Sequence, residues 1–139
     1  MTIPPAIDAV SVALLRGERV LLVRRGRAPA MGLFAFRGGR VEAGETLEDA
    51  VRRELREETG LKADAVAPVV TLDIDPEGSG PAFRLHVFRA LYAGGEPQAG
   101  DDADMAGFHS LEEMTRLPVI PSVLEVARRL LGTPSPDVD

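Results

Sequence analysis

The chain has 139 residues, no cysteine and a formal net charge of −6 at pH 7. The length suits one domain. The absence of cysteine excludes disulfides and thiolate metal sites, and the acidic balance argues against nonspecific binding to nucleic acids or membrane surfaces. We therefore predict one folded domain over residues 1–132 and a disordered tail over 133–139.

The beginning of the sequence has neither the basic start nor the long apolar run of a signal peptide. No apolar stretch approaches the length that a membrane-spanning helix requires. These features lead us to expect a cytoplasmic protein.

Apolar runs and alternating residues predict strands over residues 7–15, 20–23 and 33–36. Between the second and third of these lies a loop that carries Arg24, Arg25 and Arg27. A solvated basic loop and a phosphate-binding loop are equally good interpretations of it. A glycine-rich turn, which includes Gly38 and Gly39, follows the third strand.

A helix is predicted over residues 47–59, between an N-cap at Thr46 and a terminating Gly60. Its side chains Glu54, Glu57 and Glu58 share one face near the C-terminal end. There the helix dipole disfavours each carboxylate by about 0.3–1 kcal/mol. A solvated, salt-bridged face would explain such acids in isolation, but beside a glycine loop a divalent cation such as Mg²⁺ explains them better.

Further strands are predicted over residues 66–74, 83–92 and 107–109, the first of them interrupted by Pro68 as an edge strand or bulge would be. A polar, acid-rich loop spans residues 94–104. Ser110 begins a short helix, and Pro121 and Gly132 frame a longer one. Strands flanked by helices indicate an α/β or α+β sandwich.

Residues 39–61 read GRVEAGETLEDAVRRELREETGL and match every fixed position of the pattern G-x5-E-x7-R-E-U-x-E-E-x-G-U, where U is aliphatic. This segment resembles the Nudix box, and its flanks resemble the ADP-ribose pyrophosphatase-like branch of the Nudix hydrolases. The resemblance implies an α/β/α sandwich with a mixed central sheet. It also implies metal-dependent hydrolysis of a pyrophosphate bond in a nucleoside diphosphate linked to another moiety, with an ADP-ribose-like substrate favoured.

The same resemblance implies roles for individual residues. Glu57 and Glu58 would be metal ligands together with the Gly38 carbonyl, and Glu54 would be a further ligand or the general base. Arg53 would orient these glutamates and keep them ionised. The cation would be Mg²⁺, with Mn²⁺ as a substitute.

Glu45 would assist catalysis by holding a water or a second metal ion. A distant acid completes the site in several relatives, and Asp101, Asp102 and Asp104 are candidates, with Asp102 preferred. Solvated loop acids remain the alternative interpretation for the other two. The predicted substrate-binding residues are Arg24, Arg25, Arg27, Phe34 and Arg37. Many relatives carry Trp at the position of Phe34 and Pro at that of Arg37, and neither position is a metal ligand.

Two other functions stay open at this point. One is a nucleoside triphosphate pyrophosphohydrolase that removes damaged nucleotides, and the other is a ligand sensor of Nudix descent that binds without cleaving. Pro76, downstream of the box, resembles a proline of the ADP-ribose-hydrolysing subgroup and favours an ADP-ribose-like substrate. We expect a nucleotide-derived small molecule as the partner, with no nucleic acid or membrane, and a monomer or homodimer.

Overall fold

The computed structural model describes residues 5–26, 30–76, 78–96 and 103–132, with side chains at all of these positions except 58, 59 and 103–105. Its elements, in chain order, are β1 (Ile7–Arg16), β2 (Arg19–Arg25), β3 (Phe34–Ala35), β4 (Arg37–Arg40), α1 (Leu47–Thr59), β5 (Lys62–Ile74), β6 (Phe83–Gly94), β7 (Ala103–Ser110), α2 (Leu111–Met114) and α3 (Pro121–Leu131). The predicted tail, 133–139, lies outside the described residues.

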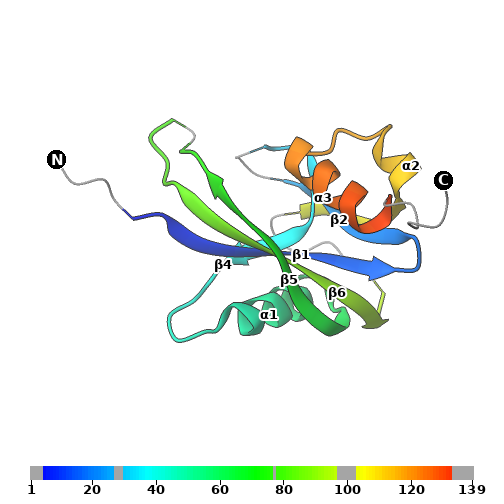
Figure 1. Cartoon of the computed structure of the whole chain (residues 1–139), viewed down its shortest axis with the longest axis horizontal. Helices are drawn as coiled ribbons and strands as arrows, with labels where there is room; N and C mark the ends of the chain where they lie inside the picture. Colours follow the sequence, from blue (N-terminus) through cyan, green and yellow to red (C-terminus); the bar gives the residue numbers. More distant parts are fainter. Residues whose placement is uncertain (1–4, 27–29, 77, 97–102, 133–139) are drawn as a thin grey trace.

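The strands form one mixed sheet in the order β3-β2-β1-β6-β5, while β4 pairs with β1 and β7 pairs with β2. β1 and β6 run parallel, and the other pairs are antiparallel. Helix α1 lies on one side of the sheet, and α2 and α3 lie on the other (Figure 1). The predicted α/β/α sandwich with a mixed sheet is therefore confirmed.

Strand β1 is the centre of both hydrophobic cores, because successive side chains of a strand point to opposite faces. Val10, Val12 and Leu14 pack with the apolar stripe of α1. Ala13, on the other face, belongs to the core that includes Val126 and Ala127 of α3. Such double burial accounts for the almost continuous apolar sequence of β1.

Helix α1 has the predicted bounds, and local side-chain chemistry explains both ends. The Thr46 side chain accepts a hydrogen bond from the Asp49 backbone N–H at 3.0 Å, and the Asp49 side chain completes a capping box. At the other end Gly60 adopts φ 72°, the left-handed conformation that favours glycine. These two signals fix the ends of the helix that carries Glu54, Glu57 and Glu58.

Three strands differ most from the prediction. The expected glycine turn at residues 37–40 is strand β4, β5 begins at Lys62, and β7 begins at Ala103. β4 forms by pairing with β1, and the missing side chain of Gly38 allows the two strands to approach closely. A Cβ built on Gly38 would overlap the carbonyl oxygen of Val10. β5 lies at the end of the strand order, and its register shifts between Pro68 and Val70, in agreement with the predicted irregular edge strand. Among the helices of the described ranges, none has the length and apolar character needed to cross a membrane.

Candidate active site

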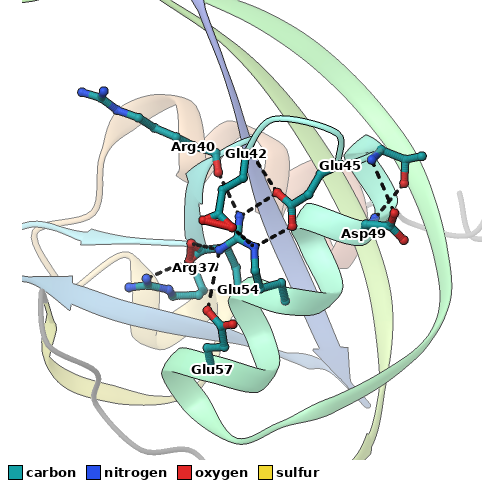
Figure 2. Close-up of polar contacts among 9 residues, drawn as sticks. Arg37, Arg40, Glu42, Glu45, Asp49, Glu54 and Glu57 are labelled. Carbon is teal, nitrogen blue, oxygen red and sulfur yellow. Dashed lines mark hydrogen bonds and ion pairs between the residues drawn. The ribbon is translucent and has the colours of Figure 1, made fainter.

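Arg53 of α1 forms ion pairs with four acidic side chains, Glu42, Glu45, Glu54 and Glu57, and Figure 2 shows these four carboxylates between α1 and the loop that precedes it. Its Nε and Nη2 atoms donate to the two carboxylate oxygens of Glu45 at 2.6 and 2.9 Å. Nη2 also donates to the Arg40 carbonyl oxygen at 3.0 Å. The Arg53 side chain is only 14% exposed. Such a bidentate, charge-assisted pair fixes the loop after β4 against the helix.

The Glu54 carboxylate packs next to Gly39 of β4 and contacts two guanidinium groups. Arg37 Nη2 donates to Glu54 Oε2 at 3.0 Å, and Arg53 Nη1 donates to Glu54 Oε1 at 3.3 Å. A Cβ built on Gly39 would overlap this carboxylate, so a side chain at that position would displace Glu54 from its present place. The carboxylate is buried, and its two arginine contacts keep it from being an uncompensated charge.

Glu57 extends the acidic group toward solvent. Its side chain is 55% exposed, and Oε2 lies 3.8 Å from Nη1 of Arg53, the atom that also contacts Glu54. Gly38, whose carbonyl is the predicted backbone ligand, lies on β4 opposite Ser11. The Glu58 side chain is outside the described part of the chain. Among the side chains that the structure does describe, no three or more histidine, aspartate or glutamate residues form a group that could hold a metal ion.

The predicted substrate-binding residues that the structure describes differ in burial and surroundings, although Arg24 of β2 pairs directly with Phe34 of β3. Arg24 and Arg25 lie at the end of β2 and are half-buried, whereas Phe34 packs inside the core against His109, with ring centroids 5.9 Å apart. Arg37 is buried beneath α1 against Glu54 instead of facing solvent. Arg27, Asp101 and Asp102 lie outside the described residues, and at position 104 only the backbone, within β7, is described.

Sequence reasoning missed Glu42. Its Oε1 lies 3.3 Å from Arg53 Nε, and its backbone N–H donates to Glu45 Oε1 at 2.8 Å. The signal that could have found it is its position in the loop, three residues before Glu45, since acids at that spacing in a turn can meet one arginine. Glu42 thus adds negative charge next to the group centred on Arg53.

Arg53 also sets the electrostatics of Glu45. Its hydrogen bonds to the carboxylate lower the pKa of Glu45 from 4.5 to about 2, with a further contribution from the Glu42 backbone N–H. The same contact with Glu45 raises the pKa of Arg53 above its ordinary value. Both groups are therefore ionised throughout the neutral range.

This pKa shift predicts how stability depends on pH. Because the pKa of Glu45 is depressed in the folded state, its stabilising effect is present above the ordinary pKa of 4.5 and is lost as the pH falls toward about 2. Urea unfolding of the native chain and of Glu45→Gln, from neutral pH to pH 2, measures this. The difference between their free energies of unfolding should be constant above about pH 5 and shrink below it. A difference that does not change with pH would contradict the assigned pairing.

Comparison with known proteins agrees with this architecture. Residues 5–130 match the family model of the NUDIX domain. The chain belongs to the NUDIX family. The matched domain covers almost the whole chain and contains residues 39–61, which resemble the Nudix box. The family prediction is therefore confirmed.

Three similar proteins illustrate the range of activities named among the proteins that this chain resembles. The ADP-ribose pyrophosphatase of Methanocaldococcus jannaschii is 40% identical over 120 residues, covering 81% of this chain and 66% of the relative. The oxidized purine nucleoside triphosphate hydrolase of Mus musculus is 35% identical over 91 residues, covering 66% and 58%. This chain thus spans less than two thirds of either relative's length. The crystal structure of a MutT NUDIX hydrolase from Burkholderia pseudomallei superposes with a TM-score of 0.81 at 26% identity, covering 91% of this chain and 98% of that one.

Proposed function

We propose that this NUDIX chain is a metal-dependent pyrophosphohydrolase, an enzyme that acts on phosphorus-containing acid anhydrides. The observation that carries the proposal is the arrangement around Arg53. One guanidinium holds Glu45 and Glu54 in place and leaves Glu57 exposed on the same side of α1. A partly buried cationic centre with an exposed carboxylate beside it supports a reaction that handles phosphate oxygens and water.

The donor set fits a hard divalent cation. The Gly38 carbonyl and the carboxylates of Glu54, Glu57 and Glu58 would hold Mg²⁺, or Mn²⁺ in its place, because all of these donors are oxygen atoms. When bound, the cation would neutralise phosphate oxygens and polarise a water molecule. Glu54 would act as a ligand or as the general base.

Arg53 and Arg37 would act by positioning. Arg53 would orient Glu45 and Glu54 through its hydrogen bonds to them, and it lowers the pKa of Glu45. Arg37, which we predicted to bind substrate, is buried against Glu54, and this location supports a positioning role. Arg24 and Arg25 remain proposed phosphate contacts, and Glu45 is proposed to hold a water or a second metal ion. Arg27, Phe34 and Asp102 keep their predicted roles as proposals.

The proposed substrate is ADP-ribose or a similar nucleoside diphosphate linked to a sugar-like group, cleaved to AMP and a phosphorylated sugar. The 40% identity to a relative named ADP-ribose pyrophosphatase supports this choice. The second candidate is a nucleoside triphosphate, supported by the relative that hydrolyses oxidized purine triphosphates. A cytoplasmic location and a monomeric or homodimeric state stay predictions.

A substrate panel with Mg²⁺ or Mn²⁺ tests the proposal. ADP-ribose, dinucleotides and normal or oxidised triphosphates are each assayed by product chromatography, with and without chelator. We expect turnover that chelation abolishes and that added metal restores, with the highest kcat/KM for ADP-ribose. A triphosphate preferred by about tenfold or more, which corresponds to about 1.4 kcal/mol, would overturn the substrate but not the reaction. Undiminished turnover after exhaustive chelation would overturn the metal requirement, and binding without turnover would indicate a sensor.

A further inference from the structure

Arg37 forms an ion pair that is unusual for its burial. The register that pairs Val12 with Arg37 directs both side chains to the face of the sheet that α1 covers. The Arg37 and Glu54 side chains are only 6% and 9% exposed, and their contact is 3.0 Å long. Moving two such charges from water into a protein interior is costly and is repaid only by good mutual geometry.

Both oxygens of the Glu54 carboxylate are therefore engaged by cations of the chain itself. Oε1 accepts from Arg53 at 3.3 Å and Oε2 from Arg37 at 3.0 Å. Arg53 has its shorter contacts elsewhere, at Glu45 and the Arg40 carbonyl. Of these two guanidinium contacts with Glu54, the one from Arg37 is the shorter.

We propose that Arg37 acts as an internal cation that competes with the divalent metal for Glu54. The inference rests on the proposed function, in which Glu54 is a metal ligand. A carboxylate oxygen has lone pairs for a second partner, but a divalent ion and a guanidinium on the same oxygen repel one another. Metal binding at Oε2 therefore requires Arg37 to share the oxygen or to move away.

This competition has two consequences. Without metal, Arg37 compensates the buried charge of Glu54 and keeps the site folded. The affinity of the site for the metal is also lower than the same oxygen donors would provide if Arg37 were absent. Arg37 is thus a positioning residue that sets the metal concentration at which the site fills.

The test measures Mn²⁺ binding in the absence of substrate, by electron paramagnetic resonance of the free ion. Arg37→Gln removes the positive charge but can still donate an N–H to Glu54, and we expect it to tighten Mn²⁺ binding by about tenfold. Arg37→Lys keeps the charge and should remain within about threefold of the native chain. Arg40→Met is the matched control, because this exposed arginine lies on the same strand and contributes only its backbone carbonyl to the site. Its affinity should not change.

Thermal unfolding provides a second readout. Arg37→Gln should lower the Tm without metal, and saturating Mn²⁺ should raise its Tm by more than it raises that of the native chain. Native Mn²⁺ binding that is equal to or tighter than that of Arg37→Gln would overturn the inference and leave the proposed function standing. Equal tightening in Arg37→Lys and Arg37→Gln would also overturn it, because charge would not be the cause. No Mn²⁺ binding by either the native chain or Arg37→Gln would remove the metal requirement itself, and the inference with it.

Discussion

Replacing Arg53 with methionine is expected to lower the free energy of unfolding by about 3 kcal/mol or more. The guanidinium makes a bidentate contact with Glu45, donates to the Arg40 carbonyl and reaches Glu54, and its side chain is 14% exposed. Its loss leaves Glu45, itself only 16% exposed, without its principal partner. Urea unfolding without metal measures the effect, and activity should fall as well because the acids lose their orientation.

The matched control is Arg52→Met, at the neighbouring position of the same helix. Arg52 is 43% exposed, and it pairs with Glu48 and donates to the Ala63 carbonyl. Exposed helix pairs contribute less than about 1 kcal/mol. Equal destabilisation by the two variants would show that the buried group around Arg53 has no special structural role.

Replacing Glu57 with glutamine is expected to lower kcat by about 100-fold or more while the free energy of unfolding changes by less than about 0.5 kcal/mol. Its side chain is 55% exposed, and its only ion pair within the described part of the chain is a 3.8 Å contact with Arg53. A carboxylate near a helix C-terminus is also slightly unfavourable. Structure alone therefore gives little reason for an acid here, whereas the proposed metal site needs one. Initial rates and thermal unfolding of the metal-free protein measure the two effects.

Glu48→Gln provides the comparison for this variant. Glu48 lies in the first turn of α1, and its side chain is 54% exposed, so it matches Glu57 in exposure and chemistry. It lies outside the proposed site, and activity should therefore be unchanged. A loss of several kcal/mol of stability in Glu57→Gln, or an equal loss of activity in both variants, would show that Glu57 is not a specific ligand.

The sequence by itself determined the features that depend on neighbouring residues. The capping chemistry of Thr46 and Gly60 marked both ends of α1, because these interactions span only a few residues. The fixed spacing of residues 39–61 indicated the family, and the double burial of β1 followed from its apolar run. Pro68 correctly indicated an irregular edge strand.

Only the tertiary structure decided where the site residues lie. Residues 37–40 resemble a turn because of their glycines, but pairing with β1 makes them a strand, and no local signal encodes that contact. This pairing buries Arg37 against Glu54, and the packing of the second core encloses Phe34, and the sequence indicated neither of these locations. Glu42 joins Arg53 only because the loop folds back on α1. Local propensity cannot reveal such contacts, because they form between segments that become neighbours only when the sheet assembles.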